Sequence, residues 1–211
     1  MIRLLDYAAN ESYLKNACYI RYLDLAIVFY AIISRKEDTL ATALIPESIF
    51  NVWEITKEQL LADTLETMQR NFPAEVTTMY EMLKKRMEER AADSFAKQMN
   101  VPEVDLEEIE YSKTFLMATI KGNINGAAVL LYPGFLKSIA KKIGAKELNI
   151  IPSSIHELLL LPMDEKTKRN YILDMIAEVN REEVQPEEKL SDSLYIYDLE
   201  TDSVRVWEEK E

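Results

Sequence analysis

Short apolar runs alternate with polar turns along much of the chain, a pattern typical of strand hairpins and amphipathic helices. Residues 22–34 and 39–45 are apolar runs separated by a polar turn, so they are predicted to form a hairpin. Pro46 ends the second run because proline cannot donate a hydrogen bond to a strand ladder, and a short helix is predicted after it. A second hairpin-Pro-helix unit is predicted from the runs at 114–120 and 127–132, followed by Pro133 and a helix over 134–143.

Longer helices are predicted where apolar residues recur at helical spacing. Thr56 and Gln59 have the spacing of a capping box, so a helix is expected to begin there. Its apolar stripe ends just before Pro73 and consists of Leu61, Leu65, Met68 and Phe72. Further helices are predicted over 74–98 and after a cap at Asp164. The stripe of the Asp164 helix consists of Ile172, Met175, Ile176 and Val179.

The stretch 149–162 is predicted to lie at the centre of the fold. Apolar runs at 148–151 and 158–161 are typical of buried strands, and a polar crossing separates them. The crossing carries Ser153, Ser154, Glu157 and the single histidine of the chain, His156. A last hairpin is predicted from 193–197 and 203–207.

Together these elements predict an α+β protein. Its sheet is expected to be mixed or mostly antiparallel, built from hairpin-Pro-helix units, with helices packed on one side. Residues 100–111 contain Pro102 and an acidic cluster and are the best candidate for a linker. They suggest an N-terminal lobe of hairpins and helices over 1–100 and a C-terminal α+β lobe over 101–211, which contains the 149–162 motif. One continuous domain is the alternative.

Composition favours a soluble protein of the cytoplasm. Hydrophobic residues make up 48% of the 211 positions, enough to form a substantial core. The longest apolar run, 25–33, is too short to cross a bilayer about 30 Å thick as a helix, and the N-terminus lacks the order of a signal peptide. Cys18 is the single cysteine and permits no intramolecular disulfide. We therefore expect a reducing compartment and no association with membranes.

The net charge of −12 argues against nucleic acid as a direct partner, because it opposes attraction to phosphate backbones. Acidic residues concentrate in the second half, in a cluster at 103–110 and from 178 onward. Such runs are typical of solvated loops. A sharper alternative is an acidic decoy that occupies a nucleic-acid-binding protein.

Several classes of chemistry lack their sequence motifs. The four glycines cannot form either of the glycine-rich loops that hold nucleotide phosphates. One histidine and one cysteine cannot form a Cys/His zinc site, and no residues have metal-ligand spacing. No G-x-S-x-G motif is present. We predict no cofactor and no metal.

The polar crossing is the single group of residues that could form a catalytic site. His156 could activate the hydroxyl of Ser153 or Ser154, and Glu157 could orient the imidazole, as in serine hydrolases. The alternative is structural: the serines turn the chain after Pro152, and His156 bonds to backbone at the start of a strand.

A basic helix face follows Pro133 and is a candidate binding surface. Lys137, Lys141 and Lys142 lie on it, with no acidic residue between Pro133 and Lys146. In the simpler interpretation they are the solvated side of an amphipathic helix. Alternatively they bind an anionic ligand or an acidic surface of another copy.

The sequence resembles an uncharacterised bacterial family built on a domain of unknown function. The resemblance rests on 22–30 (YLDLAIVFY), 127–134 (AAVLLYPG), 151–157 (IPSSIHE) and the segment 178–192, of which the I-P-S-S-I-H-E block is the most specific. It implies an intact fold and a special status for 151–157. It supplies no activity, ligand or catalytic residue.

The absence of catalytic, nucleotide and metal motifs favours a noncatalytic protein-interaction or regulatory module. Its partner is expected to be another protein, and homo-oligomers are compatible with the sequence. The rival hypotheses are a hydrolase that uses Ser153 or Ser154 with His156, and the acidic decoy of a DNA-binding protein.

Overall fold

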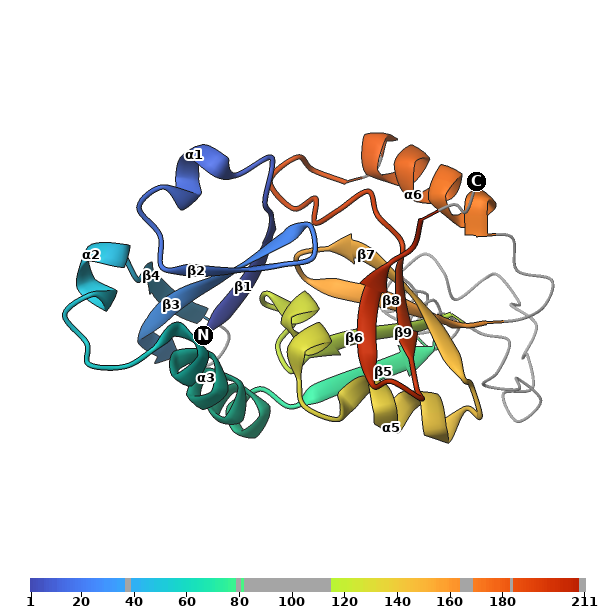
Figure 1. The fold of residues 1–211 in the computed structure, drawn as a ribbon, viewed down its shortest axis with the longest axis horizontal. Helices are drawn as coiled ribbons and strands as arrows, with labels where there is room; N and C mark the ends of the chain where they lie inside the picture. Colours follow the sequence, from blue (N-terminus) through green and yellow to red (C-terminus); the bar gives the residue numbers. More distant parts are fainter. Residues whose placement is uncertain (37–38, 79–80, 82–114, 164–168, 183, 209–211) are drawn as a thin grey trace, which may run out of the picture.

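A computed structural model describes residues 1–36, 39–78, 81, 115–163, 169–182 and 184–208. Within these ranges the chain forms two antiparallel sheets, one of four strands and one of six, with helices around them (Figure 1). The α+β class and the antiparallel sheets predicted from sequence are confirmed.

The four-stranded sheet is formed near the N-terminus around one long strand. It contains β1 (Ile2–Asp6), β2 (Tyr19–Tyr22), β3 (Leu25–Lys36) and β4 (Thr39–Leu44). The first part of β3 lies between β1 and β2, and its second part pairs with β4 as the predicted hairpin. Because β3 is flanked on both sides only at its start, its residues 25–30 are buried and its residues 31–36 are exposed.

The six-stranded sheet has the order β10-β9-β7-β8-β6-β5. Its strands are β5 (Ala74–Thr78), β6 (Leu116–Ile120), β7 (Glu147–Ser154), β8 (Glu157–Pro162), β9 (Tyr195–Asp198) and β10 (Ser203–Val206). The predicted central pair is therefore present as β7 and β8, with Ile150 opposite Leu160. The last predicted hairpin is present as β9 and β10.

Helices lie around the two sheets, and those at 135–142 and 169–182 lie on opposite faces of the six-stranded sheet. The helices are α1 (Glu11–Leu14), α2 (Glu47–Phe50), α3 (Lys57–Asn71), the 3₁₀ helix η4 (Gly126–Leu131), α5 (Phe135–Lys142) and α6 (Arg169–Glu182). Ile172 and Ile176 of α6 pack on Ile196. The apolar side of α5 joins the main core on the opposite face, and Figure 1 shows α5 and α6 at opposite ends of these strands. The expectation of helices on one side only therefore does not describe this sheet.

One continuous core joins the two sheets. It contains Ile27 and Phe29 of β3, Leu65 of α3, and Leu148 and Tyr195 of the larger sheet. Alternation along β7 explains how one strand serves two layers: Ile150 faces this core, whereas Ile151 faces α6. The division at residue 100 stays a prediction. We note that β5, which precedes it, pairs with β6, which follows it.

Two predicted elements differ in type from those observed. Residues 74–78, predicted as the start of a helix, form β5, because their Val and Thr side chains suit a strand and β6 supplies the ladder. The rest of that helix, apart from residue 81, lies outside the described residues, at 79–80 and 82–98, as does the Asp164 cap. The run 127–132, predicted as a strand, is the 3₁₀ helix η4. A short apolar run does not by itself distinguish a strand from a buried helix. The predicted hairpin of this unit is therefore wrong, whereas its first strand is present as β6 and the helix after Pro133 as α5.

Cys18 lies in the core with no exposed surface, and burial raises the pKa of its thiol to about 11. The thiolate is the reactive form, so the native thiol is expected to stay unreactive toward dithiobis-nitrobenzoate near pH 8. In guanidinium chloride one equivalent should react at once. Prompt reaction of the native protein would contradict the burial of Cys18.

Candidate functional site

The polar crossing predicted from sequence is the tight connection between β7 and β8. Thr119 of β6 donates its hydroxyl to the carbonyl oxygen of His156 at 2.8 Å, and Ala127 of η4 donates its backbone N–H to the carbonyl of Ile155 at 3.2 Å. Ile155 in turn donates its N–H to the carbonyl of Glu188 at 2.9 Å. The connection is therefore held by backbone contacts to three other parts of the chain.

The two serines of the crossing are used locally. The Ser154 hydroxyl accepts the backbone N–H of His156 at 3.1 Å, which closes the turn. The Ser153 hydroxyl donates to Glu157 Oε1 at a long 3.4 Å. Neither hydroxyl is hydrogen-bonded to the imidazole in the described part of the chain. The structure brings Ser153, Ser154, His156 and Glu157 together, and their catalytic use stays a prediction.

The imidazole of His156 faces a different set of groups. Its Nδ1 lies 3.0 Å from the carbonyl oxygen of Asn123 and 3.3 Å from the backbone N–H of Asn125, and its Nε2 lies 3.8 Å from Glu188 Oε1. Unprotonated Nδ1 accepts from Asn125, whereas protonated Nδ1 donates to Asn123. His156 therefore joins three loops of the six-stranded sheet.

The Asp24 carboxylate accepts three side-chain hydrogen bonds from the C-terminal segment. It follows Leu23 in the turn between β2 and β3, where Leu23 adopts a φ of 55°. Ser191 and Ser193 donate their hydroxyls to its Oδ2 at 2.6 and 2.9 Å, and Tyr195 donates to its Oδ1 at 2.6 Å. Burial, followed by this bond to Asp24, raises the pKa of Tyr195 far above its usual range. Asp24 thus ties the N-terminal sheet to the C-terminal segment.

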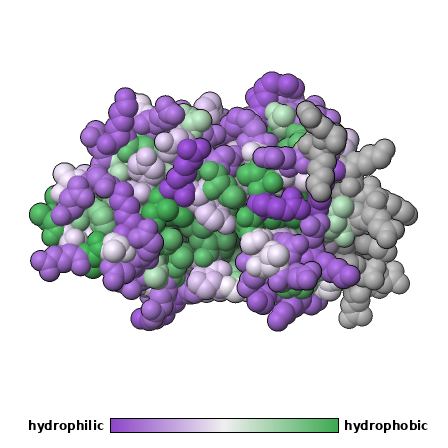
Figure 2. All heavy atoms as spheres, in the orientation of Figure 1, coloured by the Kyte–Doolittle hydropathy of each residue, from purple (hydrophilic) through white to green (hydrophobic). Residues whose placement is uncertain are grey.

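A cleft of about 600 Å³ lies between the two sheets and is lined mainly by apolar side chains. Its lining includes Leu61 and Leu65 of α3, Leu131 of η4, Leu136 of α5 and Val204 of β10. Figure 2 shows these hydrophobic surfaces gathered in the middle of one face, between α3 and the β9–β10 hairpin, with hydrophilic side chains around them. We call this hollow the central cleft.

A polar group forms part of the lining of the central cleft. Asp202, which has a φ of 52°, accepts the Tyr197 hydroxyl at 2.7 Å and the Lys137 ammonium group at 2.8 Å. The bond from Lys137 and then the bond from Tyr197 lower the pKa of Asp202. Burial, then the bond to Asp202, raise the pKa of Tyr197. The predicted binding residue Lys137 is thus ion-paired at the mouth of the cleft, while Lys141 and Lys142 lie exposed on the same helix.

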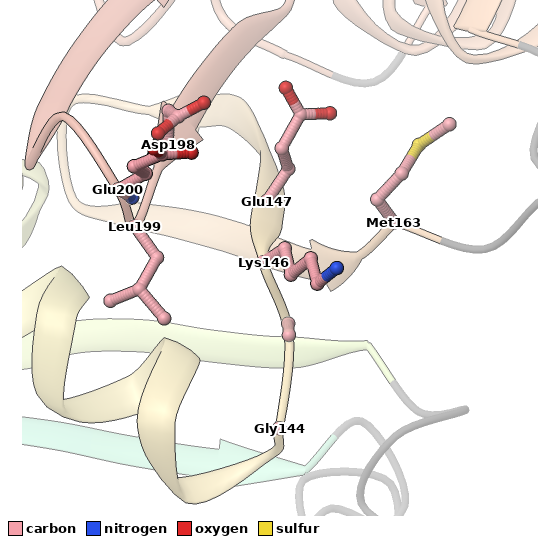
Figure 3. A pocket seen from close by; sticks show the side chains of 8 residues that line it. Gly144, Lys146, Glu147, Met163, Asp198, Leu199 and Glu200 are labelled. Atoms are coloured by element: carbon pink, nitrogen blue, oxygen red, sulfur yellow. Dashed lines mark hydrogen bonds between the residues drawn. The ribbon is translucent and has the colours of Figure 1, made fainter.

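A second hollow, of about 810 Å³, is formed by 144–147, 198–200 and Met163 (Figure 3). Two of its acidic side chains, Glu147 and Asp198, already have partners. Glu147 pairs with Arg169 at 2.7 Å and with Arg205 at 3.4 Å, and Asp198 accepts the backbone N–H of Thr201 at 2.9 Å. In Figure 3 the Lys146 side chain extends toward Met163 and the Glu147 carboxylate points away from Gly144. The side chains around this hollow therefore form no convergent polar site.

No group of three or more metal-binding side chains occurs among the residues that the structure describes. None of the helices described there is long and apolar enough to span a membrane.

Comparison with known families gives one match, which covers residues 1–199. Its family model is described as a family of unknown function, DUF5688. The chain belongs to the DUF5688 family. No curated protein and no solved structure matches it. The resemblance to a family of unknown function is therefore confirmed, while the special status of the I-P-S-S-I-H-E block stays a prediction. In this DUF5688 protein the strand β10 lies beyond the matched residues.

Sequence reasoning missed the central cleft and the Asp24 cluster of this DUF5688 chain. The serines at 191 and 193 and Tyr195 are spaced two residues apart, a weak signal that their side chains share one face of a strand. Nothing in the sequence connects them with Asp24, because the separation is at least 167 residues. The cleft has no sequence signal, because its lining comes from elements far apart in the chain, among them β3, α3, η4, α5 and β10.

Proposed function

We propose that this DUF5688 protein is a noncatalytic protein-interaction module that holds an apolar segment of a partner in the central cleft. The observation that carries the proposal is the cleft itself, an open hollow of about 600 Å³ with an apolar lining. Ligand sites in proteins are concave, mostly apolar and roughly 300–1,000 Å³ in volume, with a few polar groups that orient the ligand. Tyr197, Asp202 and Lys137 are such groups.

The contacts at the polar crossing support a noncatalytic reading. The Ser153 and Ser154 hydroxyls bond to Glu157 and to the backbone of His156, so neither is positioned to give its proton to the imidazole. A serine-reactive fluorophosphonate is therefore expected to leave the protein unlabelled. Labelling that disappears in a Ser153→Ala, Ser154→Ala double variant would replace the proposal with the hydrolase hypothesis.

The binding proposal is tested with two pools of synthetic peptides and the ¹⁵N-labelled protein. One pool has apolar residues at alternate positions, as in a strand, and the other has them at helical spacing. We expect at least one pool to shift the amide resonances of Leu61, Leu65 and Leu131 in a saturable way, because these residues line the cleft. Shifts from neither pool would overturn the proposal.

A matched pair of variants locates the binding. Leu131→Lys places a charge in the cleft, and Val52→Lys places the same charge on a side chain that is 74% exposed and does not line the cleft. Binding should be lost in the first variant and kept in the second. Equal loss in both would mean that the added charge, and not the cleft, decides binding.

A further inference from the structure

β10 is an outer strand of the six-stranded sheet, and one of its edges is unpaired among the residues that the structure describes. β10 pairs with β9 on one side and is the last strand of the sheet. Trp207 donates its backbone N–H to the carbonyl of Leu194 at 2.8 Å. Arg205 and Ser203 lie two and four residues before it, so their backbone groups also point toward β9. Backbone groups alternate in direction along an antiparallel strand, so the N–H and C=O of Val204 and Val206 point away from β9.

This edge has no hydrogen-bond partner within the described ranges. No bond from the backbone of Val204 or Val206 to another segment is present there. Long exposed strand edges are templates for pairing with another chain. Here the edge is short, and its use therefore depends on what lies beside it.

The central cleft lies beside this edge. Val204 lines the cleft, and Val204 and Val206 both pack toward the core between the sheets, whereas Trp207 faces the opposite layer. In an antiparallel pair, residues that exchange hydrogen bonds lie directly opposite each other and share a face. A strand added to β10 would therefore bond to Val204 and Val206 through the same residues whose side chains enter the cleft.

Charges around β10 differ between its two ends. At the start of the strand, Lys137 and Lys141 lie near Asp202, and Asp198 lies opposite Ser203. Glu208 follows the strand at its other end, and Asp24 is bonded there to Tyr195, the residue opposite Val206. A strand that runs antiparallel to β10 begins beside the acidic end and finishes beside the lysines.

We propose that the occupant of the central cleft is an extended segment of a partner protein that pairs antiparallel with the free edge of β10. This proposal rests on the proposed function and names the form of its ligand. The segment carries apolar residues at alternate positions, a basic residue at its N-terminal end and an acidic residue at its C-terminal end. Main-chain bonds to Val204 and Val206 hold it, and the cleft selects its apolar side chains.

A second copy of the chain is a poorer occupant on charge grounds. Symmetric pairing of two β10 strands with Val204 opposite Val206 places Arg205 opposite Arg205, and like charges directly opposite each other are destabilising. Sedimentation velocity tests this point. A dimer that Val204→Pro disperses would assign the edge to a second copy and overturn the partner proposal.

The main test uses fluorescent peptides of the form Lys-X-Thr-X-Thr-X-Glu, in which X is Val, Ile, Leu or Phe. N-methylation of the backbone amides of the X residues removes the donors that face β10, whereas N-methylation of the Thr amides leaves those donors intact. We expect the first change to weaken binding at least tenfold and the second to leave it within about threefold, since only the first removes main-chain bonds. Equal effects of the two modifications would overturn the proposal.

Substitutions in β10 of the protein test the same main-chain bonds. Val204→Pro removes an outward-facing N–H and leaves the ladder to β9 intact, and Val204→Ala keeps the N–H and shortens the side chain. The affinity for the peptide should fall at least tenfold in the proline variant and less in the alanine variant. The near-ultraviolet circular dichroism should be unchanged in both. The peptide with its Lys and Glu exchanged should bind more weakly at low salt. Tighter binding of the exchanged peptide would overturn the orientation.

The outcomes separate this proposal from the proposed function. If the helical pool alone shifts the cleft resonances, the cleft is a binding site and the strand proposal is wrong. If neither pool shifts them, both proposals are wrong. If the peptides still bind after N-methylation of their apolar residues, the proposed function is kept and pairing with β10 is overturned.

Discussion

Replacement of Asp24 by Ala is expected to lower the free energy of unfolding by about 3–5 kcal/mol. Asp24 accepts hydrogen bonds from Ser191, Ser193 and Tyr195, and Tyr195 has no exposed surface. Hydrogen bonds to a charged group contribute about 1.5–3 kcal/mol each, and a buried hydroxyl without a partner adds a desolvation penalty. Guanidinium chloride denaturation followed by circular dichroism measures the loss.

Tyr195→Phe is the matched control for Asp24→Ala. It removes one of the three donors and keeps the ring in the core, so a loss of about 1–2 kcal/mol is expected. If Asp24→Ala unfolded no more easily than Tyr195→Phe, the two serine bonds would contribute nothing to the link between the N-terminal sheet and the C-terminal segment.

Replacement of Gly126 by Ala is expected to cost at least about 3 kcal/mol. Gly126 opens η4, and a Cβ there would overlap the Thr119 hydroxyl and the carbonyl oxygen of His156. Those two groups are hydrogen-bonded to each other at 2.8 Å. The added methyl group must therefore break this bond and push η4 away from the β7–β8 connection, which adds overpacking to the lost bond.

Gly134→Ala controls for the general cost of replacing a glycine. Gly134 has a φ of +73° and nothing within contact distance of an added Cβ. The cost of Gly134→Ala therefore comes only from placing alanine in a left-handed backbone conformation, about 1–2 kcal/mol. Thermal unfolding compares the two variants. A Gly126→Ala variant as stable as Gly134→Ala would mean that η4 does not press against the β7–β8 connection.

Local signals in the sequence predicted the elements whose structure depends on near neighbours. The capping box is present as predicted: Thr56 accepts the N–H of Gln59 at 3.2 Å, and Gln59 accepts the N–H of Thr56 at 2.8 Å. The β3–β4 hairpin and the β7–β8 pair were also predicted correctly. In each case the turn residues and apolar spacing lie within a few residues of the element they specify.

Elements whose type depends on distant partners were predicted less well. Residues 74–78 become a strand because β6 lies beside them, and 126–131 become a 3₁₀ helix because Gly126 fits against the β7–β8 connection. The polar crossing shows the same limit for the site. Its four residues are adjacent as predicted, yet the groups that face the imidazole, at 123, 125 and 188, come from loops that sequence reasoning did not connect with it.

The sequence by itself determined the α+β class, the antiparallel hairpins, the start of α3 and membership of a family of unknown function. These follow from periodicity and turn chemistry, which act over a few residues. Only the tertiary structure decided where the free edge of β10 lies, that apolar side chains from separate elements enclose a cleft beside it, and that Asp24 joins segments more than 160 residues apart. The physical reason is that such features arise from long-range packing of both sheets, for which no local pattern of residues is required.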